Sequence, residues 1–212
     1  SESKLRNSVA YMYYKDNINE NNIYRAIEYF TISANENDSD ALHHLGVIYM
    51  ENEKVRDINK AIHYLNLASN NNYSTSQLYL GINYLSGQYI PRNANKGIPY
   101  LKLSAANNNT DALFWLGLQY YDGINVPKDL NKCVNYLTIA AQKGNSNAQI
   151  YLGYIHYQGY YTKDIPKAIH YFNLAANQNN HFAQIYLSLI YLFEKPYINI
   201  NKGLKLVNFL AN

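Results

Sequence analysis

The chain has 212 residues, of which 48% are apolar and 16% are charged, and its formal net charge is +3. Its basic residues are scattered, which argues against a dedicated nucleic-acid or anionic-membrane surface. No run approaches eighteen consecutive apolar residues, so no bilayer-spanning helix is expected, and the lone Cys133 excludes an intramolecular disulfide framework.

A repeated motif runs along the chain. It consists of a Leu-type residue, a small residue and an aromatic residue three positions further on. Its copies begin, in chain order and with separations of 36, 35, 36, 36 and 35 residues, at Val9, Leu45, Leu80, Leu116, Leu152 and Leu187. In the fourth copy Ala112, Leu116 and Tyr120 are four residues apart, which predicts one face of a helix. A Gly inside a helix costs about 1 kcal/mol relative to Ala, so Gly117 and its equivalents indicate close helix approach.

A second motif follows each copy of the first. A basic residue precedes a small residue and an aliphatic one, usually with Tyr four positions after the basic residue, and it starts at Arg25, Lys60, Lys96, Lys132, Lys167 and Lys202. Two helices per 35–36 residues predict an all-α fold, an α-solenoid of about six helix-turn-helix repeats. We expect a single repeat domain over residues 1–212, with repeats at about 4–38, 39–74, 75–110, 111–146, 147–181 and a truncated 182–212.

Polar residues mark the expected helix ends. The residues expected to cap the second helices stand three positions before the basic residue, at Asn22, Asp57, Asn93, Asp129, Asp164 and Asn199. Residues that tolerate the left-handed conformation follow those helices at Asn37, Asn72, Asn108, Gly144 and Asn179. Two positions later, Ser39, Ser74, Thr110 and Ser146 are expected to cap the next first helix. This turn chemistry also accounts for the three N-x-S/T sequons, at Asn37, Asn72 and Asn108.

The combined pattern resembles the Sel-1-like repeat family, which is related to tetratricopeptide repeats. The best matches are Ala112–Ala141 and Ala148–Ala176, with the loop glycine of the family at Gly87, Gly123 and Gly159. Asn52 and Glu194 replace that glycine, so their loops are expected to differ. The resemblance implies a right-handed superhelix whose first helices line a concave face, a role as an adaptor for protein–protein contacts, and no cofactor.

Aromatic side chains also occupy faces of the first helices that packing on the second helices does not require. Tyr and Trp combine apolar area with a polar group and are enriched in binding hot spots. We therefore expect a protein or peptide segment to bind in the concave groove through Tyr14, Phe114, Trp115, Tyr121, Tyr151, Tyr154 and Tyr157. The alternative is that neighbouring first helices bury much of this band. For Phe114 the sequence supports burial and binding equally.

Other residue types suggest no chemistry. The six His residues form no ligand set, so no metal site is expected, and Cys133 stands in a column of small residues, which favours a buried structural thiol. The row of basic residues is expected to pair with the neighbouring helix caps.

The sequence favours a non-enzymatic scaffold, with a bacterial host-interaction (virulence) or envelope setting as one possibility. The alternatives are an oligomerisation module that pairs through its terminal repeats, a eukaryotic adaptor for endoplasmic-reticulum quality control, and a Tyr-rich carbohydrate binder. No signal peptide is recognised, and the compartment is left open between cytoplasm and bacterial periplasm or envelope.

Overall fold

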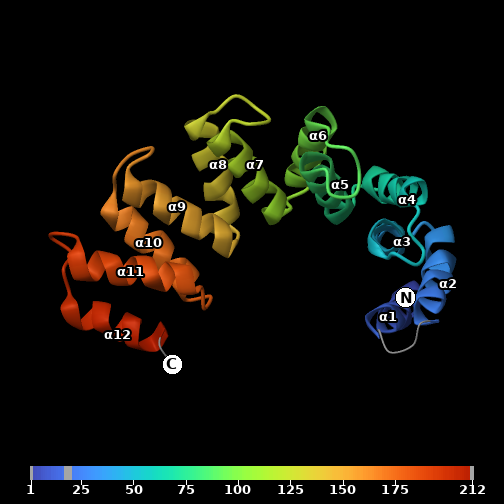
Figure 1. Ribbon diagram of the computed structural model, residues 1–212, viewed down its shortest axis with the longest axis horizontal. Coiled ribbons are helices and arrows are strands. Elements are labelled where there is room, and N and C mark those ends of the chain that lie inside the picture. The colour runs from blue at the N-terminus through green and yellow to red at the C-terminus, as the bar shows by residue number, and fades with distance from the viewer. Residues whose placement is uncertain (1, 17–20, 211–212) are drawn as a thin grey trace. The chain divides into compact units, whose positions relative to one another are not determined.

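The structure is a computed structural model that describes residues 2–16 and 21–210, and within these residues all regular structure is helical (Figure 1). Residues 211 and 212 of the expected sixth repeat lie outside this part. The helices are α1 (Glu2–Lys15), α2 (Asn22–Asn35), α3 (Ser39–Glu51), α4 (Ile58–Asn70), α5 (Ser74–Ser86), α6 (Ala94–Ala106), α7 (Thr110–Asp122), α8 (Leu130–Gln142), α9 (Ser146–Gln158), α10 (Ile165–Ala176), α11 (His181–Phe193) and α12 (Ile200–Leu210). The predicted all-α fold of helix-turn-helix repeats is thereby confirmed.

The chain divides into two compact units, Ser1–Ala112 and Leu113–Asn212. Within the first unit α1 packs on α2, α3 on α4 and α5 on α6, and α2 and α4 also contact the helix that follows them. The second unit repeats this arrangement through α8–α9, α9–α10, α10–α11 and α11–α12. The prediction of one repeat domain over residues 1–212 stays a prediction.

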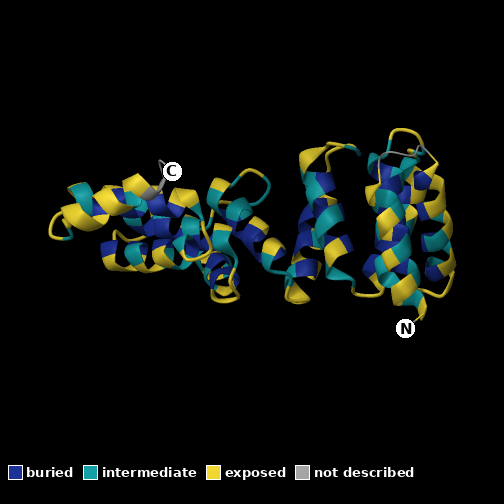
Figure 2. Ribbon diagram, turned by 90° about the horizontal axis from the view of Figure 1, so that it is seen from below, coloured by how far each residue is buried: buried dark blue, intermediate teal, exposed yellow. Residues whose placement is uncertain are grey.

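Each unit has apolar cores between adjacent helices, and buried residues alternate with exposed ones along the helices (Figure 2). In the first unit Ala10, Phe30 and Leu45 belong to one cluster of fully buried side chains, drawn from α1, α2 and α3. In the second unit Phe172 of α10 and Leu187 of α11 share another. The 3.6-residue period of the sequence thus places its apolar stripe between neighbouring helices.

The small residue of the first motif is required by close helix approach, as predicted. A Cβ atom added to Gly46 would lie 2.4 Å from Leu65 Cγ, and one added to Gly153 would lie 2.6 Å from Phe172 Cδ1. Both Leu65 and Phe172 are fully buried. In these two repeats the first helix therefore lies too close to the second for a Cβ atom to fit unless the facing side chain shifts.

The predicted caps of the second helices are confirmed for the five repeats that carry Asp57, Asn93, Asp129, Asp164 and Asn199. In each, the side-chain oxygen accepts a hydrogen bond of 2.9–3.2 Å from the backbone N–H of the residue three positions further on. The prediction is wrong for Asn22, which is the first residue of α2 and donates through Nδ2 to Asp16 Oδ2 at 2.8 Å.

The caps predicted for the first helices are also wrong, by one residue. Ser39, Ser74, Thr110 and Ser146 are the first residues of their helices. The capping side chain stands one position earlier at Asp38, Asn109, Asn145 and, in the sixth repeat, Asn180, whereas Tyr73 before Ser74 makes no side-chain cap. The left-handed residues stand where predicted, and Asn37 has φ 61°. A single extended residue, Asp38, separates Asn37 from the next helix, so the cap lies one residue earlier than predicted.

The loops also follow the predicted glycine pattern. Gly87 and Gly159 end α5 and α9 in the left-handed conformation, with φ of 73° and 76°. Asn52 and Glu194 stand at the same point in extended conformation, with ψ of 116° and 112°. These two loops therefore leave their helices in a different direction, as the missing glycine suggested.

The row of basic residues has two structural partners. The ammonium of Lys60 lies 3.8 Å from Asp57 Oδ2, as expected, and 5.2 Å from the ring centroid of Tyr49. The Tyr49 ring is in turn stacked on Tyr64 at 5.9 Å and an interplanar angle of 9°. The same pair of parallel rings recurs in other repeats, at Tyr13–Tyr29, Tyr84–Tyr100, Tyr120–Tyr136 and His156–Tyr171. The motif Tyr residues thus fix the first helix to the second.

Candidate functional site: an aromatic face in the second unit

Six of the seven residues predicted to bind a partner lie in the second unit. They come from α7 (Phe114, Trp115 and Tyr121) and from α9 (Tyr151, Tyr154 and Tyr157). Tyr14 is on α1 in the first unit, with its ring 6.4 Å from that of Tyr11. Burial and, to a lesser degree, the Glu51 carboxylate raise the pKa of Tyr14. Tyr14 is therefore considered apart from the other six.

Phe114, Trp115 and Tyr151 form one group of rings. Phe114 is edge-on to Trp115 at 5.9 Å and to Tyr151 at 5.5 Å. Phe114 itself is only 8% exposed, whereas Trp115 and Tyr151 are each 36% exposed. Phe114 is thus a buried support for the other two, which present the accessible ring surface. Edge-to-face pairs of this kind each contribute about 0.5–1.5 kcal/mol beyond area burial.

Tyr121, Tyr154 and Tyr157 form a second group through two further tyrosines. Tyr160, in the loop after α9, lies 6.2 Å from Tyr121 and 5.7 Å from Tyr154 between ring centroids. Tyr186 of α11 lies 5.9 Å from Tyr154 and 6.0 Å from Tyr157. The predicted residues are therefore brought together partly by neighbours outside the predicted set.

The phenol groups of this second group remain protonated at neutral pH. The hydroxyls of Tyr154 and Tyr160 are 3.4 Å apart, and this hydrogen bond raises the pKa of Tyr154 to about 12. Burial raises the pKa of Tyr121, whose ring also has the Lys128 ammonium 5.3 Å from its centroid. Neutral phenols of this kind can donate and accept hydrogen bonds with a partner.

An apolar cavity of about 410 Å³ opens between α9 and α11. It is lined by Asn147, Ile150, Tyr151, Tyr154, Phe182 and Tyr186. None of these side chains carries a charge, and Phe182 at the cavity is 68% exposed. The cavity joins both ring groups, since Tyr151 belongs to one and Tyr154 to the other. We call this surface, together with Trp115, whose ring is joined to Tyr151 through Phe114, the aromatic face.

Sequence reasoning did not assign three aromatic residues of the ring groups and the cavity, Tyr160, Phe182 and Tyr186, or the cavity residues Asn147 and Ile150. Tyr186 stands in the same repeat column as Trp115 and Tyr151, so the column could have identified it. Phe182 lies in the first turn of α11, ahead of that column. Tyr160 lies in a loop, where no helical period relates it to the other rings.

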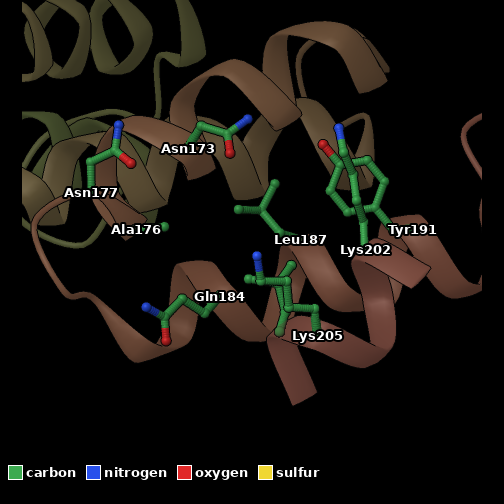
Figure 3. A pocket seen from close by; sticks show the side chains of 9 residues that line it. Asn173, Ala176, Asn177, Gln184, Leu187, Tyr191, Lys202 and Lys205 are labelled. Atoms are coloured by element: carbon green, nitrogen blue, oxygen red, sulfur yellow. The ribbon is translucent and has the colours of Figure 1, made fainter. Parts of the chain in front are cut away.

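A second cavity of the second unit, of about 390 Å³, lies among α10, α11 and α12 (Figure 3). Lys202 and Lys205 line it, with the Lys202 ammonium 5.2 Å from the centroid of the Tyr191 ring. Gln184 also lines it, and its side-chain oxygen has no hydrogen-bond partner within the described residues. In the preceding repeat the equivalent oxygen of Gln149 accepts from Gln178 Nε2 at 2.9 Å.

Other chemistry is sparse in the part of the chain that the structure describes. No group of three or more His, Cys, Asp or Glu side chains there could hold a metal ion. Cys133 is fully buried, and burial raises the pKa of its thiol to about 12. None of the described helices is long and apolar enough to cross a membrane.

Comparison with protein families decides what these repeats are. The family model of the Sel1 repeat matches residues 7–38, 39–73, 74–109, 110–145 and 146–180. The chain belongs to the Sel1 repeat family. Sel1 repeat proteins are in general protein-interaction scaffolds and in general not enzymes. Among curated proteins, no sequence matches this Sel1 repeat chain.

Solved structures agree with this family. The chain resembles c5321, a protective antigen of uropathogenic Escherichia coli strains with an SLR fold, at 25% identity and a TM-score of 0.81. The match covers 99% of this chain but 46% of c5321, so the chain spans about half the length of that protein. A Sel1 repeat protein from Oxalobacter formigenes matches at 24% identity and a TM-score of 0.83, over 99% of this chain and 87% of that one.

A more distant structure shares the fold. Immunity protein Pa5087 from Pseudomonas aeruginosa is 17% identical, with a TM-score of 0.61, over 99% of this chain and 81% of that chain. At this identity the likeness concerns the fold alone.

Proposed function

We propose that this Sel1 repeat chain is a non-catalytic scaffold that binds a protein or peptide segment on the aromatic face of its second unit. The observation that carries the proposal is the 410 Å³ uncharged cavity between α9 and α11, lined by the exposed Tyr151 ring, which is joined through Phe114 to the exposed Trp115. Partner-binding hot spots are enriched in Trp and Tyr and lie in apolar depressions.

The chemistry of the face favours an apolar segment with few charges. A charged side chain that entered the cavity would lose its hydration without a counter-charge among the lining residues. The phenol hydroxyls of Tyr154 and Tyr160 and the Asn147 amide could satisfy backbone or side-chain polar groups at the edge. An amphipathic helix, laid with its apolar face on the cavity, meets these requirements.

The chain's single Trp provides the measurement. Binding on the aromatic face should change the emission of Trp115, and titration of a purified partner, first obtained by capture on the wild-type chain, gives its affinity. Tyr151→Ala keeps the Trp115 reporter and should weaken binding by about 1–2 kcal/mol, a factor of roughly 5–30.

The matched control is Tyr24→Ala. Tyr24 is 54% exposed on α2 and belongs to the first unit. It should leave the affinity unchanged, and circular dichroism should show native helicity for both variants. If Tyr151→Ala bound as tightly as the wild type, the aromatic face would not be the binding site.

We further propose a bacterial setting that faces a host or the cell envelope. c5321 is described as a protective antigen, and it matches 99% of this chain at 25% identity. c5321 is a bacterial protein, which favours this setting over an adaptor of the endoplasmic reticulum. Antibody against the chain should label the cell surface or the envelope fraction of the source organism, and labelling confined to the cytoplasmic fraction would reject the proposal.

A second candidate function is oligomerisation through a terminal repeat. The observation that favours it is a set of apolar side chains on α12, where Ile200, Leu204 and Val207 are 50%, 49% and 41% exposed. Sedimentation velocity should then show a mass that rises with concentration, and Leu204→Glu should return the chain to a monomer. A wild-type mass that does not change with concentration would reject this candidate.

A further inference from the structure

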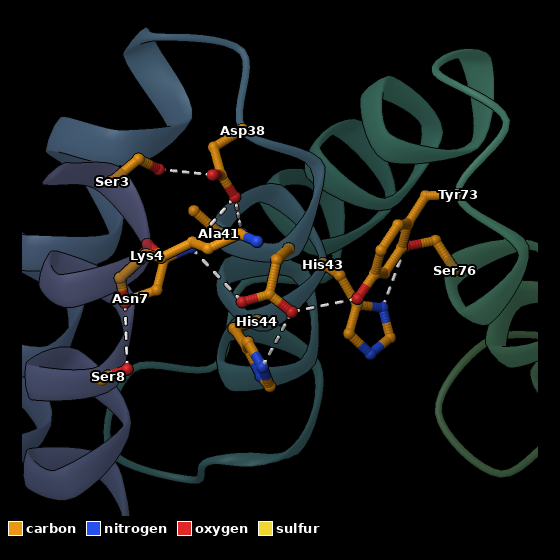
Figure 4. Close-up of polar contacts among 11 residues, drawn as sticks. Ser3, Lys4, Asn7, Ser8, Asp38, Ala41, His43, His44, Tyr73 and Ser76 are labelled. Carbon is orange, nitrogen blue, oxygen red and sulfur yellow. Dashed lines mark hydrogen bonds and ion pairs between the residues drawn. The ribbon is translucent and has the colours of Figure 1, made fainter. Parts of the chain in front are cut away.

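The first unit contains an acidic cavity that the aromatic face does not involve. Its volume is about 620 Å³, and it lies between α1 and the first turns of α3. Lys4, Asn7 and Tyr11 of α1 line it from one side, and Asp38, Asp40 and His44 line it from the other. Figure 4 shows the polar contacts around it.

Hydrogen bonds hold the two carboxylates in place. Asp38 caps α3 by accepting from the Ala41 N–H at 3.0 Å, and it also accepts from the Ser3 hydroxyl and from Asn7 Nδ2. Burial alone would raise its pKa, but these hydrogen bonds keep the pKa of Asp38 below the ordinary value. Asp38 is therefore a fixed negative charge at neutral pH.

Asp40 is positioned by residues of α1 and α3 and by Tyr73 in the turn before α5. Its Oδ1 accepts from the Tyr73 hydroxyl at 2.9 Å, and its Oδ2 from Asn7 Nδ2 at 3.3 Å. The His44 Nε2 lies 3.6 Å from Asp40 Oδ1. Burial lowers the pKa of His44 more than Asp40 raises it, so this imidazole is neutral at neutral pH. The charges that line the cavity are thus two carboxylates and the ammonium of Lys4.

Asn7 supplies an acceptor that the fold does not use. It is 7% exposed, and its Nδ2 donates to both carboxylates, which fixes the orientation of the amide. Its Oδ1 has no hydrogen-bond partner within the described residues. A buried carbonyl without a donor is destabilising, so a ligand that donates to it is stabilised there.

The cavity therefore combines fixed negative charge, an unpaired buried acceptor and aromatic rings. The Tyr11 ring, 5.5 Å from that of His44, already has the Lys15 ammonium 5.3 Å from its centroid, so this ring accepts cations. A ligand that fits all three features is a cation with several N–H donors. A guanidinium has five such donors in a planar arrangement that suits carboxylates, whereas an ammonium has three around one point.

We propose that this cavity binds the arginine side chain of a partner protein, with its guanidinium donating to Asp40, Asp38 and the side-chain oxygen of Asn7. The site lies in the first unit and does not depend on the aromatic face, so either proposal can fail while the other stands.

The test uses three blocked peptides of equal length that differ at one residue: arginine, lysine or citrulline. Citrulline has nearly the shape of arginine but no charge. Binding to the wild-type chain is followed by amide chemical shifts of the first unit. We expect the arginine peptide to bind at least about tenfold more tightly than the citrulline peptide, with an affinity that falls as salt rises.

Asp40→Asn should reduce arginine-peptide binding by about tenfold or more. Glu53→Gln removes the same charge from an exposed position of the first unit and should have little effect. Equal binding of the arginine and citrulline peptides to the wild type would overturn the proposal, whether or not Asp40→Asn folds. Equal binding of the lysine peptide would overturn the assignment to guanidinium.

Discussion

Replacement of Gly46 by Ala tests how closely the two helices of a repeat approach each other. The new Cβ would lie 2.4 Å from Leu65 Cγ, 2.8 Å from Leu65 Cδ2 and 3.2 Å from the Ala61 carbonyl oxygen. Leu65 is fully buried and cannot move aside without displacing its neighbours. Overpacking of this kind costs about 1–3 kcal/mol, whereas Ala is preferred over Gly in a helix by about 1 kcal/mol. We expect a net loss of up to about 2 kcal/mol.

The same substitution should change sign when Leu65 is shortened. Leu65→Ala alone should destabilise the fold by about 2–5 kcal/mol, because it leaves a cavity. In that background the added methyl of Gly46→Ala meets no side chain of Leu65, so the substitution should become stabilising by up to about 1 kcal/mol. The two substitutions are thus coupled, and the double-mutant cycle measures the coupling directly.

Urea unfolding, followed by far-ultraviolet circular dichroism, gives the free energy of unfolding for the wild type, both single variants and the double variant. The expected result is a positive coupling that reverses the effect of Gly46→Ala. If Gly46→Ala stabilised the chain with Leu65 present, the contact would not be tight, and the explanation for the repeated small residue would fail.

Three further predictions concern the caps, the thiol and acid stability. Asn145→Ala should cost about 1 kcal/mol of unfolding free energy, and Ser146→Ala clearly less, because Asn145 is the cap of α9; equal losses in urea unfolding would contradict this assignment. Cys133 should resist a thiol reagent in the folded chain at neutral pH and react at the rate of unfolding, because burial raises its pKa to about 12; labelling as fast as that of a free thiol would show that it is accessible. The pKa of Asp38 in the folded chain is below its ordinary 3.8, so its contribution to stability is present above pH 3.8 and is lost as the pH falls through the folded pKa. On acidification Asp38→Asn should therefore lose less unfolding free energy than the wild type. Equal losses would contradict this.

Much of the repeat architecture could be predicted from the sequence. The 35–36-residue period, the two helices per repeat and the tight position at Gly46 follow from spacing and residue size alone. The caps at Asp57 and Asp164 could be predicted because Asp is preferred at the N-cap of a helix, where its carboxylate accepts from the backbone N–H three residues further on. The left-handed Asn residues could be predicted because few residue types tolerate that conformation.

The remaining features depend on contacts that spacing does not encode. The cap of α3 is Asp38 and not the predicted Ser39, because backbone geometry sets the number of extended residues in the turn and spacing does not encode it. The stack of Lys60, Tyr49 and Tyr64 joins two helices, and only their relative rotation brings the rings parallel. In the sequence these three residues belong to separate repeat positions, and their spacing does not show that they touch.

The aromatic face was predicted in part for the same reason. Trp115 and Tyr151 are half-exposed on one face of the second unit, but Phe114 beside them is buried. Periodicity placed all three outside the core stripe of a single helix, yet it could not say how much of each ring the next first helix covers. The contribution of Tyr160 comes from a loop, where no periodicity applies.

The central claim is that a partner binds on the aromatic face, and photocrosslinking tests it most directly. A photoreactive phenylalanine derivative is placed at Tyr151 in one variant and at Tyr24 in another, and each is irradiated with the purified partner. The account predicts a crosslink to the partner from Tyr151 and none from Tyr24. A crosslink from Tyr24 alone, with the partner bound at wild-type affinity, would contradict it.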